Sequence, residues 1–221
     1  MTVTDPATDA PAFAVLIPVK PPAYAKSRLA LPPDLSDPAR QRLAEAFALD
    51  TIAACLAAER VGAVLVVTDD AFFSRSVLVL GATAIPDGAA GDLNASLCQG
   101  AAEAARRWPE LTPAAVCADL PALRAAELDA ALGAVVPGGP SIVADAEGRG
   151  TTLYTAPVGQ FAPLFGVDSR DAHAAAGALE IRGALPTLRR DVDDLAGLTE
   201  AARLGLGPRT LAVAAELGLL G

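Results

Sequence analysis

Three aspartates in this sequence are candidates to hold a metal ion against a phosphate. Asp119 follows an apolar stretch at residues 114–118, and Asp191 and Asp193 stand two positions apart near the C-terminal end. In an extended segment, residues two apart project to the same side, which places Asp191 and Asp193 together. Two like charges repel unless a cation lies between them, and oxygen-only ligands suit magnesium. The pattern predicts a Mg²⁺ site, with capping of a turn or helix by Asp119, Asp193 or Asp194 as the alternative.

Three cations follow the first predicted strand. Residues 13–19 form an apolar run, and the loop after it carries Lys20, Lys26 and Arg28. In an acidic protein, cations in this place indicate a polyphosphate clamp, because Lys supplies a point charge and Arg can bond two oxygens at once. A solvated surface loop is the alternative.

Three further polar groups are candidates for ligand binding. Asn94 ends a glycine-containing loop where it could read a base edge, or it could serve in a helix cap. Thr151, after Gly150, offers a hydroxyl and a backbone N–H suited to a carboxylate or phosphate, although loop glycines also serve turn geometry. Ser169 is the predicted N-cap of a helix, and the N–H groups at a helix start favour anions.

His173 is the only histidine in the chain. A serine–histidine–acid triad would depend on it, but the sequence has no Gly-x-Ser-x-Gly pattern of a nucleophile elbow. We interpret His173 as structural or orienting.

Strand-like and helix-like segments alternate along the chain. Short apolar runs that suit buried strands occur at residues 13–19, 63–67, 83–85, 114–118, 141–144 and 152–155. Helical patterns occur at residues 36–58, 72–80, 92–108, 125–135 and 195–204, with one more starting at Ser169. This alternation predicts an α/β fold with a mostly parallel sheet, whose strands end in polar groups at the edge where such sheets bind ligands. We expect a flexible tail at residues 1–12 and a single domain over residues 13–221.

Composition limits the classes of partner. The chain has 221 residues and a net charge of −9, which argues against a nucleic acid or an anionic membrane as the main partner. Its three cysteines form no Cys-x-x-Cys pair, so neither a disulfide framework nor a zinc site is indicated. With no signal-peptide pattern and no apolar run of membrane-spanning length, we expect a cytoplasmic protein.

Six motifs, taken together and in order, resemble one known family. They are Lys20-Pro-x-x-x-Ala-Lys26-Ser-Arg28-Leu29, Asp92-Leu93-Asn94, Ala118-Asp119-Leu120-Pro121-Ala122-Leu123, Gly150-Thr151, Phe165-Gly166-x-x-Ser169 and Arg190-Asp191-Val192-Asp193. The chain resembles the guanylyltransferases of coenzyme F-420 biosynthesis, which act on phosphoenolpyruvate or 2-phospho-L-lactate. The resemblance runs over about residues 13–210.

The resemblance implies a fold and a set of site residues. The fold is the nucleotidyltransferase fold, a Rossmann-like three-layer α/β/α sandwich. The family's metal-binding aspartates fall on Asp119, Asp191 and Asp193. The positions that hold the acceptor's carboxylate fall on Thr151, Gly166 and Ser169. The loop that contacts the nucleotide triphosphate falls on Lys20, Lys26 and Arg28, and Asn94 falls near the guanine.

The resemblance also implies an activity, in which GMP passes from GTP to the phosphate of phosphoenolpyruvate with Mg²⁺ and a downstream deazaflavin transferase receives the product. Transfer to 2-phospho-L-lactate or 3-phosphoglycerate, and a non-catalytic nucleotide-binding module, remain as alternatives. A nicotinamide-dependent dehydrogenase is disfavoured because no Gly-x-Gly-x-x-Gly occurs. A homodimer is the common default for such a chain.

Overall fold

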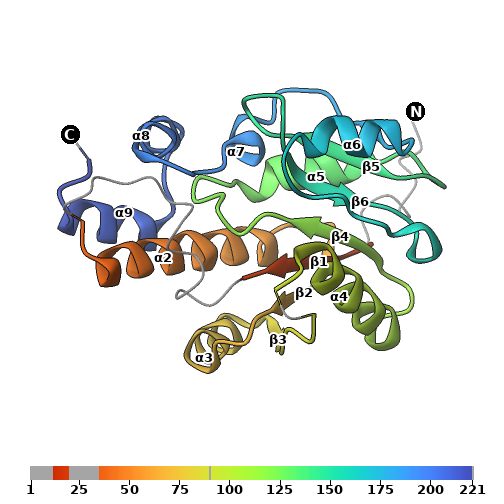
Figure 1. Cartoon of the computed structure of the whole chain (residues 1–221), viewed down its shortest axis with the longest axis horizontal. Coiled ribbons are helices and arrows are strands. Elements are labelled where there is room, and N and C mark those ends of the chain that lie inside the picture. The colour runs from red at the N-terminus through yellow and green to blue at the C-terminus, as the bar shows by residue number, and fades with distance from the viewer. Residues whose placement is uncertain (1–11, 20–34, 90, 221) are drawn as a thin grey trace, which may run out of the picture.

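The computed structural model describes residues 12–19, 35–89 and 91–220 (Figure 1). The strands are β1 (Phe13–Pro18), β2 (Val61–Val67), β3 (Thr83–Ile85), β4 (Thr112–Val116), β5 (Ser141–Ala144), β6 (Thr151–Thr155) and β7 (Leu179–Glu180). The helices are α2 (Asp37–Leu56), α3 (Ala71–Leu80), α4 (Leu93–Arg107), α5 (Ala125–Gly133), α6 (Ser169–Ala175), α7 (Pro186–Arg189), α8 (Leu195–Leu204) and α9 (Pro208–Glu216), with a 3₁₀ turn η2 (Val158–Gln160).

The strands form one sheet in the order β3-β2-β1-β4-β6-β5-β7. Every pairing is parallel except those of β6 with β4 and β5, so β6 alone runs in the opposite direction. The strand order reverses between β1 and β4, and open α/β sheets bind ligands outside the carboxyl ends of their strands at such a point. Because β6 is reversed, its first residue, Thr151, lies at this same edge.

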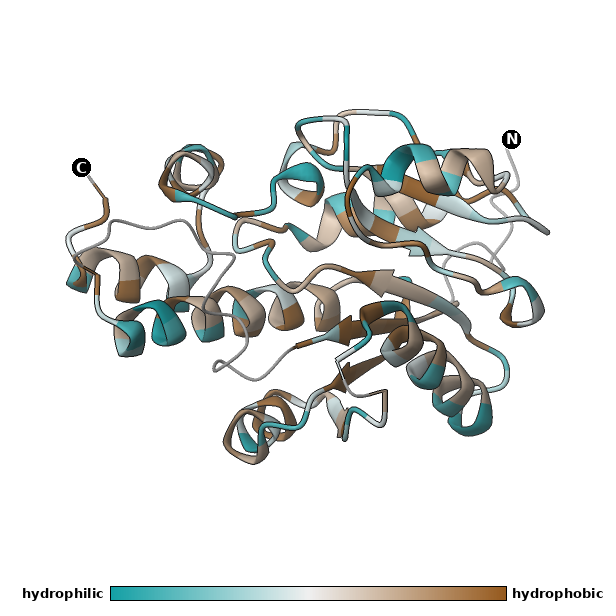
Figure 2. Ribbon diagram, in the orientation of Figure 1, coloured by the Kyte–Doolittle hydropathy of each residue, from teal (hydrophilic) through white to brown (hydrophobic). Residues whose placement is uncertain are grey.

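Helices cover both faces of the sheet, as Figure 1 shows. On one face, Ile52 of α2, Val77 of α3 and Leu128 of α5 pack in one core cluster. On the other face, Leu97 of α4 packs with Leu16 of β1 in a second cluster. Figure 2 shows the hydrophobic colour concentrated on β1 and β2, as expected for strands buried on both faces. The predicted three-layer α/β/α architecture with a mostly parallel sheet is confirmed.

The C-terminal helices pack against α2, at the end of the molecule away from β5 and β7 (Figure 1). Leu43 and Phe47 of α2 meet Leu198 of α8 in a third apolar cluster. Asp50, also on α2, is 6% exposed and accepts a hydrogen bond from the Thr210 N–H in the first turn of α9 at 2.7 Å. A carboxylate at a helix start satisfies N–H groups that lack intrahelical partners, so α2 fixes where α9 begins.

A buried threonine on α2 fixes the backbone on either side of Asp119. The Thr51 hydroxyl is fully buried, and its one proton is shared between the Phe47 carbonyl oxygen of its own helix, at 2.9 Å, and the Ala118 carbonyl oxygen, at 3.1 Å. It accepts a hydrogen bond from the Leu120 N–H, also at 3.1 Å. The segment after β4 is therefore held by a polar contact from inside the core, where lost hydrogen bonds are costly.

Most of the predicted elements are present, with two corrections. Strand β4 ends at Val116 rather than at Ala118, and Ser169 is not the N-cap of α6. Asp168 occupies that N-cap position without a side-chain capping bond, and Ser169 is the first helical residue. Strand β7, the short helix α7 and helix α9 were not predicted.

Other expectations concern the chain as a whole. Except for Ala12, the predicted tail at residues 1–12 lies outside the described residues, and the single-domain assignment remains a prediction. Over the described ranges, none of the helices has the length and apolar character that crossing a membrane requires.

Replacing Thr51 with Val keeps the shape of the side chain and removes its hydroxyl. We expect the free energy of unfolding to fall by about 1–3 kcal/mol, because the buried Leu120 N–H loses its partner. Denaturant unfolding measures the loss. The control is Thr199→Val on exposed α8, where the hydroxyl bonds only the Leu195 carbonyl and the expected change is below about 0.5 kcal/mol. Equal losses in the two variants would contradict a special role for Thr51.

Candidate active site

The backbone joins the two segments that carry the predicted metal ligands. The Val192 N–H donates to the Asp119 carbonyl oxygen at 3.0 Å, so the chain on either side of Val192 runs beside the loop after β4. Val192 itself is buried in the apolar cluster beneath α8. This bond brings Asp119 near Asp191 and Asp193, although more than seventy residues separate them in the sequence.

Arg189 brings the same C-terminal segment to the end of β5. Its guanidinium donates to the carbonyl oxygens of Ala144 and Ile181, both at 2.9 Å. Its own carbonyl accepts from the Ala146 N–H at 2.8 Å. These contacts place Asp191, two residues further on, against the loop between β5 and β6.

Three carboxylates meet in that place. Asp145, Glu147 and Asp191 each bring one oxygen into a group whose members all lie within 4.8 Å of one another, the only such group of acidic or metal-ligating side chains among the described residues. Oxygen-only donors at this spacing suit a hard divalent cation. Asp191 is common to this group and to the predicted set, whereas Asp145 and Glu147 were missed. The signal that could have found Asp145 is the one used for Asp119: an acid directly after a buried strand.

The surroundings of this carboxylate group shift the pKa of Asp191 strongly. Burial, together with the nearby charges of Asp119, Asp193 and Asp145, raises its pKa from 3.8 to about 8. Asp119 and Asp193 therefore belong to the same electrostatic cluster, although neither is part of the close group of three. The capping alternative is confirmed for Asp194, which caps α8 by accepting from the Gly197 N–H at 2.7 Å, while Asp191 is half-buried.

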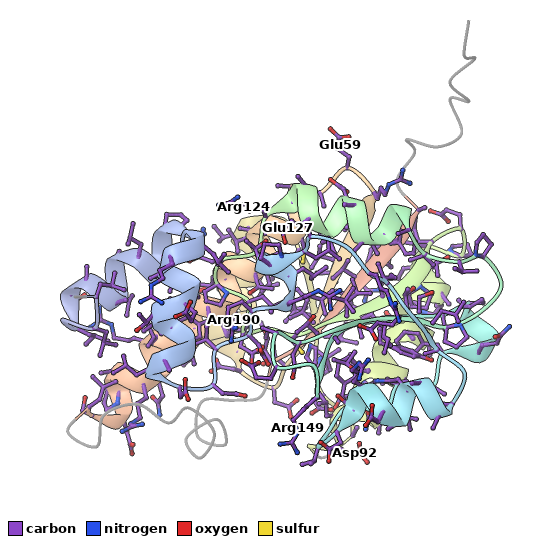
Figure 3. All side chains as sticks on the ribbon, turned by 90° about the horizontal axis from the view of Figure 1, so that it is seen from above. Glu59, Asp92, Arg124, Glu127, Arg149 and Arg190 are labelled. Carbon is purple, nitrogen blue, oxygen red and sulfur yellow. The ribbon has the colours of Figure 1, made fainter. Side chains whose placement is uncertain are left out.

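Arginines border the carboxylates. Arg190 pairs with Glu147 at 2.5 Å, and Arg149 bonds Asp168 at 2.8 Å. Figure 3 shows Arg190 near the middle of the molecule and Arg149 close to its periphery. The cations predicted to clamp the triphosphate, Lys20, Lys26 and Arg28, lie outside the described residues.

The predicted acceptor-binding residues lie along one side of this edge. Thr151 is 5% exposed at the start of β6, and Ser169 is buried at the start of α6. The Arg170 N–H donates to the Arg149 carbonyl at 3.0 Å, which joins α6 to the loop before Thr151. Gly166 has φ +150°, and a Cβ there would meet nothing within 4 Å. The backbone at Gly166 is therefore open to close approach by a ligand.

Asn94 binds the backbone of the loop that carries Gly166. Its Oδ1 accepts from the Phe165 N–H at 2.8 Å, and its Nδ2 donates to the Phe165 carbonyl at 3.0 Å. The helix that carries it, α4, is capped by Asp92 and not by Asn94. The guanine-reading role of Asn94 stays a prediction, and the structure adds a second role in holding this loop.

Comparison with known proteins identifies the family. A family model described as guanylyl transferase CofC like matches residues 13–159. The phosphoenolpyruvate guanylyltransferase of Streptomyces coelicolor is 48% identical over 95% of this chain and 99% of its own length. The chain belongs to the CofC-like guanylyl transferases.

Solved structures agree with the fold of a CofC-like protein. A protein from Desulfovibrio desulfuricans G20 assigned as a nucleotide-diphospho-sugar transferase matches with a TM-score of 0.68 at 15% identity, over 93% of this chain and 95% of that one. A nucleotidyl transferase from Methanothermobacter matches with a TM-score of 0.52 at 15% identity, over 87% and 97%. At these identities the likeness concerns the fold, which is the predicted nucleotidyltransferase fold.

The raised pKa of Asp191 makes stability depend on pH. Between pH 3.8 and about 8 the folded state keeps a proton that the unfolded state has released, so stability falls as the pH rises through this window. We expect Asp191→Asn to exceed the parent by ~2 kcal/mol at the upper end of the window and to match it at the lower end. Unfolding of the two proteins in a metal chelator, at a series of pH values, measures the difference.

The matched control is Asp171→Asn, which removes the same charge from a side chain that is 81% exposed. Its stability relative to the parent should not vary with pH across that window. If Asp191→Asn and Asp171→Asn followed the same curve, the close packing of carboxylates around Asp191 would be contradicted.

Proposed function

We propose that this chain transfers GMP from GTP to the phosphate of phosphoenolpyruvate, forming enolpyruvyl-2-diphospho-5'-guanosine in coenzyme F-420 biosynthesis. The observation that carries the proposal is the carboxylate cluster around Asp191, at the ligand-binding edge of a CofC-like protein. The chain is 48% identical to a phosphoenolpyruvate guanylyltransferase over nearly the whole of both chains, which supports GTP and phosphoenolpyruvate as the substrates.

Magnesium is the proposed cofactor. Asp119, Asp191 and Asp193 would hold it, and Asp145 and Glu147 extend the set of oxygen donors. When bound, Mg²⁺ would neutralise charge on the phosphates of GTP and on the departing pyrophosphate. The fit rests on the donor set, because burial and the neighbouring carboxylates raise the pKa of Asp191 to about 8, and a bound cation would favour its charged form instead.

The reaction needs positioning more than proton transfer. An oxygen of the acceptor's phosphate attacks the α-phosphorus of GTP, one P–O bond forms, and the bond from that phosphorus to the β-phosphate oxygen breaks to release pyrophosphate. Because the attacking oxygen is already anionic, no strong general base is required. The barrier lies in bringing two anions into line, which is the kind of work that binding groups do.

The residues of this chain divide that work between the two substrates. Thr151, Gly166 and Ser169 are proposed to hold the acceptor's carboxylate and so fix the direction of its phosphate. Lys20, Lys26 and Arg28 are proposed to bind the triphosphate and stabilise the leaving group, and Asn94 to lie near the guanine. The product is proposed to pass to a deazaflavin transferase in the cytoplasm.

The activity is tested by pyrophosphate release from GTP with Mg²⁺, with phosphoenolpyruvate, 2-phospho-L-lactate and 3-phosphoglycerate offered in parallel. The deazaflavin transferase and its acceptor are included to consume the product. We expect turnover with phosphoenolpyruvate and a kcat/KM lower by about 10-fold or more with the other acids, the scale of a one-group difference in a pocket. A higher kcat/KM with 2-phospho-L-lactate or 3-phosphoglycerate would show that phosphoenolpyruvate is not the preferred acceptor. No pyrophosphate release with any of the three acids would contradict the proposed guanylyl transfer.

Replacing Asp119 or Asp191 with Asn tests the metal site. We expect either change to lower pyrophosphate release by about 100-fold or more, the scale of removing one group that stabilises transition-state charge. Asp191→Asn is the sharper case, since it should raise stability while it abolishes turnover.

The control for both variants is Glu59→Gln. Glu59 projects from the surface in Figure 3, after α2 and away from the carboxyl edge of the sheet. The control should keep full turnover and show a rise in unfolding temperature with Mg²⁺ and GTP, whereas the Asp variants should lose most of that rise. Near-normal turnover in both Asp variants would contradict the assignment of the metal site to this cluster.

A further inference from the structure

The ring of His173 is held rigidly between aromatic side chains. His173 is 1% exposed and stacks on Tyr154, with ring centroids 4.7 Å apart and planes 24° from parallel. Phe165 meets the same ring edge-on at 5.4 Å. A ring packed on two sides cannot turn freely, so each of its nitrogens faces a fixed partner.

One of those partners determines where the proton of the ring lies. The Leu164 N–H donates to His173 Nε2 at 2.8 Å. A backbone amide can only donate, so Nε2 must carry a lone pair, and the proton of the neutral ring is on Nδ1. Burial lowers the pKa of His173, against a smaller opposing effect of the Ser169 backbone, and so favours the neutral ring.

The position of this proton decides the direction of the next hydrogen bond. His173 Nδ1 lies 3.0 Å from Thr151 Oγ1. Because Nδ1 bears the proton, Nδ1–H donates and the threonine oxygen accepts. The hydroxyl proton of Thr151 must then point away from His173. Among the described residues, Thr151 Oγ1 makes no second hydrogen bond that would take up this proton.

The place of Thr151 in the fold indicates what the proton faces. Thr151 starts the reversed strand β6, so it lies at the carboxyl edge of the sheet with the acidic cluster. Its neighbour Gly150 donates its N–H to Asp145 at 2.6 Å. His173 also holds the Gly166 loop through Leu164, and Asn94 holds that loop through Phe165.

We propose that His173 is a positioning residue that fixes the Thr151 hydroxyl as a hydrogen-bond donor to the carboxylate of the acceptor. The inference rests on the proposed function for the identity of that ligand. His173 touches neither substrate and exchanges no proton in the reaction. It determines that Thr151 offers a proton to the acceptor instead of a lone pair, which would repel a carboxylate. Through Leu164, the same ring also fixes the loop that presents Gly166.

The tautomer can be read directly, because His173 is the only histidine in the chain. Labelling the protein with ¹⁵N-histidine gives the two ring nitrogens of a single residue. We expect Nδ1 to resonate as a protonated nitrogen and Nε2 as an unprotonated one, with no change from pH 7 to 8. Protonation at Nε2 alone, or at both nitrogens, would overturn the inference whatever reaction the protein catalyses.

Two replacements separate the two hydrogen bonds of the ring. In His173→Gln, the longer amide reaches toward the position of Nε2, so it keeps an acceptor for Leu164 and loses the donor to Thr151. In His173→Asn, the shorter amide reaches toward the position of Nδ1 and keeps that donor. We expect His173→Gln to raise the KM for phosphoenolpyruvate about 10-fold or more, the scale of a hydrogen bond to a charged group. The KM for GTP should stay within about twofold, and His173→Asn should lie nearer the parent.

A double-mutant cycle with Thr151→Val shows whether His173 acts through the hydroxyl. Once the hydroxyl is gone, His173→Gln should raise the KM for phosphoenolpyruvate no further. Additive effects, or an equal loss in the KM values for both substrates, would mean that His173 only supports the fold and would overturn the inference. If His173→Gln does not fold, the comparison of His173→Asn with Thr151→Val and the ¹⁵N spectrum of the parent decide the question.

These experiments distinguish a failure of the proposed guanylyl transfer from a failure of the role of His173. A parent protein that releases no pyrophosphate with any of the phosphorylated acids would overturn the guanylyl transfer, and with it the carboxylate as the ligand of Thr151. An active parent in which His173→Gln leaves every KM unchanged would overturn the role of His173 alone.

Discussion

Repulsion among carboxylates at one edge of the sheet is the constraint on which the rest of this structure depends. Asp119, Asp145 and Asp193 lie close enough to Asp191 to help raise its pKa to about 8, an arrangement that costs stability without a cation. Three contacts hold the carboxylate cluster in place. They are the backbone bond from Val192 to Asp119, the bonds of the Arg189 guanidinium, and the bonds of the buried Thr51 hydroxyl. These contacts come from separate elements, so the cluster forms only when the whole α/β/α sandwich is assembled. Such preorganised charge is typical of sites that bind a cation or stabilise a transition state.

The second half of the site is neutral in character and lies around β6 and α6. The Gly166 loop is held by the amide of Asn94 and by the imidazole of His173, each bonded to the backbone. In the proposed function, the acidic half would bind a cation with the phosphates of the nucleotide, and the neutral half would bind the carboxylate of the acceptor. Arg149 and Arg190 are paired with Asp168 and Glu147, respectively.

Much of this arrangement could be predicted from the sequence, because short apolar runs that end in polar residues mark parallel strands. Asp119 was predicted in this way, whereas Asp191 was predicted from its spacing of two residues to Asp193. Asp145 was missed because it opens the loop between the predicted strands at residues 141–144 and 152–155, where acids commonly serve in turns. Ser169 was assigned as a cap because serine favours that position, whereas Asp168 occupies it at φ 53°. The tautomer of His173 and the contact of Thr51 depend on side chains brought together over long separations, which no local pattern encodes. The close group of Asp145, Glu147 and Asp191 likewise appears only when the strand order is known.

The central claim is that a divalent cation bound by the carboxylates around Asp191 joins this edge of the sheet to the nucleotide. The most direct measurement is a crystal structure of the protein with Mn²⁺ and GTP, without the acceptor, in which anomalous scattering locates the metal. We expect a manganese peak bonded to Asp191 and to a phosphate oxygen of the nucleotide, and the peak would also show which of Asp119, Asp145, Glu147 and Asp193 complete the shell. A nucleotide bound with its metal remote from all of these carboxylates would contradict the account.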